Sequence, residues 1–257
     1  LAGVHRSGSA GDFSGGAGHH LAEETSQNAH GTGTDPPRQI SAKACVEQTF
    51  PDKTNMLHKR EVQNMGKFTF TQTEIPGVVV IEPQVFGDDR GYFFESYSQQ
   101  QFDQAVRPVR FVQDNESKSR RGVLRGLHFQ KGAAAQSKLV RVVQGRVLDV
   151  AVDIRRGSPT FGKHVAVELT AENHRQLFVP RGFAHGFSVL SDEAVFQYKC
   201  DNFYAPQSEG AIAWNDPDLG IDWQLPAEEA ILSPKDRAHP RLKDADELFD
   251  YGIDYYA

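Results

Sequence analysis

Hydrophobic and polar residues alternate with a period of two in several short runs of this chain, most clearly over residues 146–154. Successive side chains of a β-strand point to opposite faces, so the pattern predicts a strand with one apolar and one mixed face. The preceding run, 138–143, is expected to pair with it as a hairpin across a turn at Gln144 and Gly145. The apolar face would carry Leu148, Val150, Val152 and Ile154, and the mixed face Val147, Asp149, Ala151 and Asp153.

Further strand-like runs follow at close spacing and are separated by Gly, Pro or acidic turn residues. The first half offers one convincing helix, at 99–106 with Ser98 as its cap. No ten-residue helical pattern lies between the later strands, which disfavours a parallel βαβ sheet. The pattern therefore predicts a mainly β sandwich or barrel of the jelly-roll type, with a few short helices. The other expected strands cover residues 67–71, 77–82, 92–95, 164–169, 176–179, 185–190 and 195–200.

The first 64 residues lack this pattern. They contain two of the chain's 26 aromatic residues, eight glycines by residue 33 and the pair Pro36–Pro37. Such a segment buries too little apolar surface to form a core. We therefore predict that residues 1–64 form a disordered or non-native N-terminal extension and that residues 65–257 form the folded domain. Met65 directly precedes the first strand-like run, so a natural start at Met65 is a further hypothesis.

Charge and cysteine content narrow the range of partners. The formal net charge is -6 at pH 7 with no basic patch, which argues against nucleic acid but permits a small anionic ligand held by local arginines. No apolar run is long enough to cross a bilayer or to form a secretory signal. Cys45 and Cys200 are the only cysteines, so neither a disulfide framework nor a cysteine metal cluster is indicated. We expect a cytoplasmic protein that binds neither nucleic acid nor membranes.

Titratable side chains interrupt four strand-like runs, at His128, Lys138, His185 and Tyr198. A single histidine in an apolar run is more often a hydrogen-bonded core residue than a catalytic one. The combination with lysine and tyrosine favours His128 as a catalytic base beside an anion site at Arg125. In a regular strand, however, Arg125 and His128 point to opposite faces. We therefore expect a β-bulge at Gly126 that brings both side chains into one cavity.

Five motifs occur in a fixed order between about residues 68 and 240. They read FGDDRGYFFESY at 86–97, FVQDN at 111–115, VLRGLHFQ at 123–130, GFAHGF at 182–187 and SEGAIAWND at 208–216. Together they resemble the dTDP-4-dehydrorhamnose 3,5-epimerase family, and residues 1–64 lie outside the resemblance. The resemblance implies a cupin-type double-stranded β-helix and a homodimer that needs no cofactor. It also implies inversion of C3 and C5 of dTDP-4-dehydro-6-deoxy-D-glucose in dTDP-L-rhamnose synthesis.

Epimerisation beside a ketone needs a base to remove a proton, a group to hold the enolate, and an acid to return a proton to the other face. Histidine suits the first step because its pKa lies near neutrality, and tyrosine carries an acidic phenol on a rigid stem. On the family pattern His128 is the base and Tyr198 the acid. Lys138 falls where a cation would stabilise the enolate without a metal.

A carboxylate hydrogen-bonded to His128 would fix its tautomer and stabilise the imidazolium. The resemblance gives this role to Asp236, in the sequence Ser-Pro-Lys-Asp. Asp149 is an alternative, because it lies on the mixed face of its strand. A role in which Asp149 is hydrogen-bonded to His185 or to the backbone is an equally good interpretation of that residue.

The resemblance also assigns the residues that hold the nucleotide sugar. Arg90 and Arg125 match its anion contacts, Lys235 is a further cation, and Tyr204 matches its base-stacking aromatic residue. Its remaining substrate contacts fall on Phe86, Glu95, Gln113, Asp114, Asn115, His185 and Glu209.

A metal-dependent cupin oxygenase is the main competing interpretation. Metal-binding cupins need a His-x-His pair, a following Glu and a later His, whereas this motif reads His128-Phe129-Gln130. His128 and His185 alone are too few ligands, so we predict no metal. Two other classes stay open: a non-catalytic jelly roll that binds nucleotide sugars, and a mono-epimerase that inverts only C3 or only C5.

Overall fold

The computed structural model describes residues 61–257, and the predictions for residues 1–60 lie outside this described part. Residues 61–257 contain sixteen β-strands and one α-helix, α1 (Gln99–Ala105). Ser98 occupies the N-cap position of α1, without a side-chain hydrogen bond. No helix in this part is long and apolar enough to span a membrane. The short 3-10 helices are η1 (Gly132–Ala134), η2 (Pro206–Ser208), η3 (Ala227–Glu229) and η4 (Leu242–Asp244).

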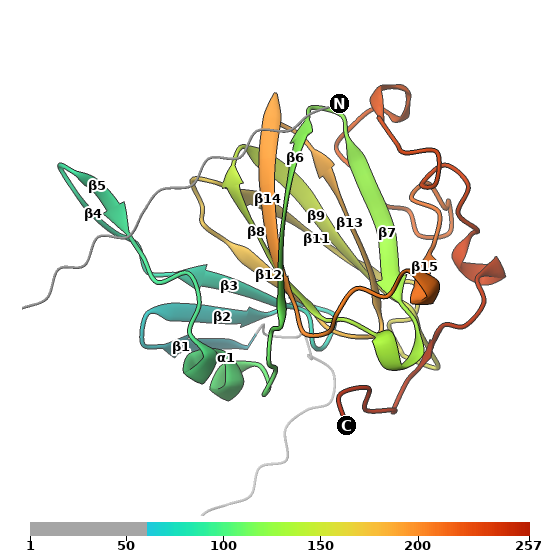
Figure 1. Cartoon of the computed structure of the whole chain (residues 1–257), viewed down its shortest axis with the longest axis horizontal. Coiled ribbons are helices and arrows are strands. Elements are labelled where there is room, and N and C mark those ends of the chain that lie inside the picture. Colours follow the sequence, from blue (N-terminus) through green and yellow to red (C-terminus); the bar gives the residue numbers. More distant parts are fainter. Residues whose placement is uncertain (1–60) are drawn as a thin grey trace, which may run out of the picture. The chain divides into compact units, whose positions relative to one another are not determined.

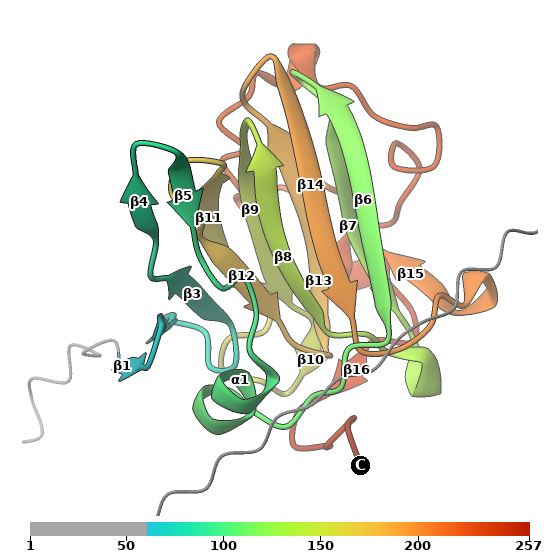
Figure 2. The ribbon, with the colours of Figure 1, turned by 60° about the vertical axis from the view of Figure 1, so that its left-hand side comes forward.

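Two antiparallel sheets face each other, as Figures 1 and 2 show. The larger has the order β1-β2-β3-β12-β8-β14-β6, and the smaller the order β11-β9-β13-β7-β15. From β6 to β9 and again from β11 to β15, consecutive strands lie in different sheets, as in a jelly roll. The larger sheet consists of β1 (Val62–Met65), β2 (Phe68–Gln72), β3 (Val79–Pro83), β6 (Gln113–Arg120), β8 (Lys138–Gln144), β12 (Gln176–Val179) and β14 (Glu193–Cys200). The smaller consists of β7 (Leu124–Gln130), β9 (Arg146–Asp153), β11 (His164–Thr170), β13 (Phe183–Val189) and β15 (Glu209–Ala211).

Two short strand pairs lie outside these sheets. The hairpin of β4 (Phe86–Asp88) and β5 (Gly91–Phe93) projects beyond the larger sheet (Figure 1). β10 (Arg155–Arg156) pairs in parallel with β16 (Phe249–Asp250), close to the end of the chain. The predicted mainly β architecture of the jelly-roll type is confirmed.

Apolar packing on both faces of β9 fixes the arrangement of the layers. Val147 and Ala151 face the space between the two sheets and pack with Val140 and Phe196 of the larger sheet. The opposite face, which carries Leu148, Val150, Val152 and Ile154, is covered by the C-terminal segment through Trp223, Leu242 and Phe249. The predicted division of β9 into two faces is confirmed. Both faces are buried, so the strand lies at the centre of the molecule's core.

The predicted hairpin around Gln144 and Gly145 was wrong. The chain does turn there, and Gly145 has a φ of +78° at a point where a Cβ would collide with the Glu193 carbonyl oxygen. However, β8 pairs with β12 and β14, whereas β9 pairs with β11 and β13. The turn therefore carries the chain from one sheet to the other. A turn signal indicates where a chain reverses, but it does not indicate which strands then pair.

The boundary expected at Met65 also differs from the structure. β1 (Val62–Met65) forms an antiparallel ladder with β2, so residues 62–64 belong to the larger sheet rather than to an extension. β6 was not predicted either, because its sequence QDNESKSR is polar throughout.

Candidate active site

Two adjoining hollows of about 370 and 280 Å³ share His128, Lys138, Tyr198 and Glu209, so we treat them as one cavity, the central cavity. His128 and Glu209 come from β7 and β15 of the smaller sheet. Lys138 and Tyr198 come from β8 and β14 of the larger sheet. The two sheets therefore bring the predicted base, acid and cation together from opposite walls.

His128 is hydrogen-bonded to a buried carboxylate. Its Nε2 lies 2.6 Å from Asp236 Oδ1, and Ser233 Oγ donates to Asp236 Oδ2 at 2.7 Å. Burial alone would favour the protonated acid, but the hydrogen bonds from His128 and Ser233 outweigh it and lower the pKa of Asp236 to about 2. With Nε2 donating to this carboxylate, Nδ1 is the ring nitrogen left to accept a proton.

A second histidine–carboxylate pair lies beside the first. His185 is the cross-strand neighbour of His128, and its Nε2 lies 2.9 Å from Asp149 Oδ1. The alternative in which Asp149 orients His128 therefore does not match the structure, because Asp149 contacts His185. Burial lowers the pKa of His185, although the charge of Asp149 opposes this effect. His185 thus lines the central cavity as a neutral hydrogen-bonding group.

Lys138 and Tyr198 form the wall opposite His128. The Lys138 ammonium lies 5.9 Å from the centre of the Tyr198 ring. Burial lowers the pKa of Lys138 and raises the pKa of Tyr198. Tyr198 therefore keeps its proton near neutral pH and is able to donate it, whereas burial destabilises the Lys138 ammonium, which a nearby negative charge would stabilise.

A β-bulge in β7 explains how Arg125 and His128 share this cavity. His128 lies opposite His185, but Arg125 lies opposite Phe187, so β7 has one more residue than β13 over this stretch. Gly126 has a φ of +133°, and a Cβ there would lie 2.6 Å from the Cα of Gly186. The predicted bulge is confirmed, and both Arg125 and His128 line the same hollow.

Most residues predicted to hold the nucleotide sugar also line the central cavity. Gln113, Asn115 and Tyr204 lie in the larger hollow, and the Tyr204 amide donates to Gln113 Oε1 at 3.0 Å. Arg125 and Lys235 lie in the smaller hollow. Glu209 borders both and forms an ion pair with Lys235. Cations and aromatic surface are thus available on the two sides of His128.

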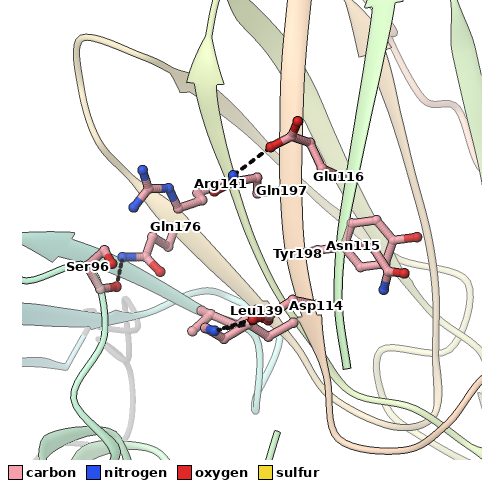
Figure 3. Close-up of a pocket in the computed structure, with 10 residues that line it drawn as sticks. Ser96, Asp114, Asn115, Glu116, Leu139, Arg141, Gln176, Gln197 and Tyr198 are labelled. Atoms are coloured by element: carbon pink, nitrogen blue, oxygen red, sulfur yellow. Dashed lines mark hydrogen bonds and ion pairs between the residues drawn. The ribbon is translucent and has the colours of Figure 1, made fainter. Parts of the chain in front are cut away.

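Asp114 does not line the central cavity of its own chain, and its role as a substrate contact stays a prediction. Side chains alternate along β6, so Asp114 points to the outer face between Gln113 and Asn115. It pairs there with Lys199 at 2.9 Å and lines a separate hollow of about 270 Å³. Figure 3 shows this hollow, with Tyr198 and Asn115 extending away from Arg141 and Gln176.

Phe86, Arg90 and Glu95 also lie outside the central cavity of their own chain. Phe86 and Arg90 belong to the β4–β5 hairpin, where Arg90 pairs with Asp88 at 2.5 Å. Glu95 follows the hairpin and pairs with Lys67 at 3.3 Å. Within one chain, these three residues are therefore separated from the other predicted substrate contacts.

His239 was not among the site residues predicted from the sequence. Its Nε2 lies 3.5 Å from Asp236 Oδ1, and its ring meets that of His128 edge to face, with the ring centres 5.7 Å apart. A search for a His-x-His pair does not find it, because it follows Asp236 by three residues in an irregular segment far from His128 in the sequence. The spacing Asp-x-x-His was the available signal.

The fold and the site together define a jelly-roll protein whose central cavity holds candidate acid–base residues. The sequence pattern of the dTDP-4-dehydrorhamnose 3,5-epimerase family matches residues 72–244. The chain is 59% identical over 178 residues to the dTDP-4-dehydrorhamnose 3,5-epimerase of Salmonella typhimurium, covering 68% of this chain and 95% of that protein. The chain therefore belongs to the dTDP-4-dehydrorhamnose 3,5-epimerase family, and it is an isomerase.

Solved structures agree with this assignment. The dTDP-6-deoxy-D-glucose-3,5-epimerase of Legionella pneumophila, in complex with dTDP-4-keto-L-rhamnose, superposes with a TM-score of 0.70 at 49% identity. The alignment covers 72% of this chain and 100% of that chain. A 3'-monoepimerase from Streptomyces bikiniensis, in complex with dTDP-quinovose, gives a TM-score of 0.63 at 36% identity, covering 67% of this chain and 87% of that one.

Proposed function

We propose that this epimerase inverts C3 and C5 of dTDP-4-dehydro-6-deoxy-D-glucose to give dTDP-4-dehydro-L-rhamnose, a step of dTDP-L-rhamnose synthesis. The observation that carries the chemistry is the placement of His128 and Tyr198 on opposite sheets around one cavity. An inversion needs proton removal from one face of a carbon and proton delivery to the other. The identity to the Salmonella and Legionella 3,5-epimerases supports the choice of substrate.

In the first half-reaction, Nδ1 of His128 takes the proton from the carbon beside the C4 ketone. Asp236 is ionised and accepts a hydrogen bond from Nε2, so it stabilises the imidazolium that forms. The electron pair of the broken C–H bond moves into the enolate, whose negative charge falls on the C4 oxygen. Lys138 is the cation in the central cavity suited to hold that oxygen.

In the second half-reaction, Tyr198 returns a proton to the same carbon from the opposite wall. Its raised pKa keeps the phenol protonated until the enolate has formed. The same pair of residues serves C3 and C5 in turn, because both carbons neighbour the C4 ketone. Arg125 and Lys235 would bind the diphosphate, and Tyr204 would stack on the base.

The proposal includes a homodimer in which the β4–β5 hairpin of one protomer completes the nucleotide site of the other. Phe86, Arg90 and Glu95 match nucleotide contacts of the family, yet they lie away from the central cavity of their own chain. Tyr92 and Phe93 on the same hairpin are each 66% exposed, and exposed aromatic residues of this kind are typical of protein interfaces. We also assign the enzyme to the cytoplasm, where the free thiol of Cys200 suits a reducing environment.

Solvent deuterium distinguishes the possible functions. The protein is incubated with dTDP-4-dehydro-6-deoxy-D-glucose in deuterated water, and deuterium at C3 and C5 is measured by NMR and mass spectrometry. Incorporation at both carbons is the expected result. Incorporation at neither would refute the proposed chemistry and leave a nucleotide-sugar-binding protein without catalysis.

Incorporation at C3 alone would indicate a mono-epimerase. A known enzyme supports this alternative, because the 3'-monoepimerase of Streptomyces bikiniensis has the same fold and is 36% identical in sequence to this chain. The product would then differ in configuration at one carbon rather than two, which NMR coupling constants around the sugar ring report directly.

A further inference from the structure

Asp236 lies between two imidazole rings, and only one of them is fully hydrogen-bonded to it. His128 Nε2 is 2.6 Å from Asp236 Oδ1, whereas His239 Nε2 is 3.5 Å from the same oxygen. His239 Nε2 is buried and has no hydrogen-bond partner. A buried polar atom without a partner is costly, so this nitrogen is available to a ligand that enters the cluster.

The chemistry of these three groups matches a divalent transition metal. His128, Asp236 and His239 each offer one ligand atom, and the three atoms all lie within 4.8 Å of one another. Zinc binds imidazole nitrogen and carboxylate oxygen at about 2.0–2.2 Å, commonly with two or three histidines and a carboxylate. The cluster differs from the cupin metal motif, because Asp236 and His239 come from the segment after β15.

We propose that His128, Asp236 and His239 form a zinc site that inhibits the epimerase. Zinc bound to Nε2 of neutral His128 forces the ring proton onto Nδ1. No lone pair then remains on the imidazole to accept a proton from the substrate. Zinc also replaces the hydrogen bond from Nε2 to Asp236, so the carboxylate no longer stabilises an imidazolium. The inhibitory effect rests on the proposed role of His128, whereas zinc binding itself does not.

The neighbourhood of the cluster permits access of a cation. The His128 side chain is 37% exposed and borders the central cavity. The positive charge of Lys235 is paired with Glu209, and Asp236 is ionised. A zinc ion thus meets one carboxylate and two imidazole nitrogens, in a hollow that Arg125 and Lys138 also line.

Zinc binding is measured first, independently of catalysis. Isothermal titration with zinc chloride compares the full-length protein with His239→Gln and with His164→Gln, which removes a histidine from β11 at the far edge of the smaller sheet. We expect one site whose affinity falls at least about tenfold in His239→Gln and is unchanged in His164→Gln. Histidines of residues 1–60 are present in all three proteins and cancel from the comparison. His239→Phe, which keeps a ring at this position, provides a second variant.

Inhibition is then measured as zinc-dependent loss of deuterium exchange into the sugar, each variant relative to its own zinc-free rate. We expect the inhibitory zinc concentration to rise at least about tenfold in His239→Gln and His239→Phe, and EDTA to restore exchange. If the wild type and both His239 variants bind zinc with equal affinity, the proposed zinc site is refuted. Zinc binding that leaves exchange unaffected overturns the inhibition. If no protein shows exchange without zinc, the proposed function fails, yet the titration still tests the site.

Discussion

At the scale of single residues, the two histidine–carboxylate pairs show how burial separates a structural role from a chemical one. The pair of His185 and Asp149 lies within the core, and burial lowers the pKa of that histidine. The pair of His128 and Asp236 borders the central cavity, and the His128 side chain is the more exposed of the two, at 37% against 6%. The first pair therefore shapes the wall of the site, and the second is placed to exchange protons with a substrate.

Replacing His128 by Asn should abolish deuterium exchange at both carbons while nucleotide binding is kept. Asparagine preserves polarity and approximate size but cannot accept the proton, and loss of a general base costs about 10²–10⁴ in rate. NMR detection of exchange and titration with dTDP measure the two properties separately. Exchange retained at the wild-type rate would show that the base is another residue.

Tyr198→Phe provides the contrasting variant, because it removes the acid and leaves the base. We expect washout of the substrate proton to survive better than formation of inverted product. Equal loss of washout and inversion would instead indicate that Tyr198 has a structural role.

The ionised state of Asp236 should appear in the pH dependence of stability. Its pKa of about 2 lies below the ordinary value of 3.8, so it stabilises the fold above about pH 3.8, and this contribution is lost as the pH falls toward 2. The difference corresponds to about 2 kcal/mol in the free energy of unfolding. The free energy of unfolding, measured with urea at pH 5 and at pH 2, should therefore fall less between these two pH values in Asp236→Asn than in the wild type. Asp246→Asn is the control, because it changes an exposed carboxylate. Its free energy of unfolding should fall between pH 5 and pH 2 by as much as that of the wild type.

At the scale of elements, the alternation of apolar and polar residues predicted the buried strands. It failed for β6, whose polar side chains line cavities. β9 and β12 were predicted within a residue of their bounds, since apolar alternation follows directly from their two faces. β6 has no apolar residue, because Gln113 and Asn115 line the central cavity while Asp114 and Glu116 line the outer hollow. Its place in the sheet depends on pairing with β14, which its own sequence does not reveal.

The bulge in β7 should depend on Gly126. Replacement by alanine places a Cβ 2.6 Å from the Cα of Gly186, at a φ of +133° that disfavours other residues. We expect a loss of about 2 kcal/mol or more in the free energy of unfolding, together with a loss of epimerisation as Arg125 and His128 separate. Urea unfolding and the exchange assay measure the two effects.

Gly132→Ala is the matched control for this substitution. Gly132 also has a positive φ, of +56°, but nothing lies within 4 Å of a Cβ added there. Alanine should cost about 1 kcal/mol at this position and leave exchange intact. Similar effects of the two substitutions would mean that close packing against β13 does not determine the geometry of the site.

At the scale of the whole molecule, the motifs predicted a candidate catalytic set without predicting how the sheets bring its members together. His128, Tyr198, Lys138 and Asp236 come from four separate segments, and the residues around each gave no local indication of their convergence. The turn at Gly145 was interpreted as a hairpin because pairing between distant strands is not encoded in adjacent residues. The projection of the β4–β5 hairpin, whose turn contains Arg90, likewise appears only in the folded chain (Figure 1).

Mixing two inactive variants tests whether that hairpin completes the site of a partner. His128→Asn removes the base, and Arg90→Gln removes an anion contact on the hairpin, so each homodimer should be inactive or strongly impaired. If the hairpin acts across the dimer, a mixed dimer holds one site with both His128 and Arg90 intact. Random exchange of protomers should then restore about a quarter of the wild-type activity, since about half of the dimers are mixed and each has one working site. No recovery, with protomer exchange shown by mass spectrometry, would mean that Arg90 serves its own chain; a monomer by light scattering would refute the dimer altogether.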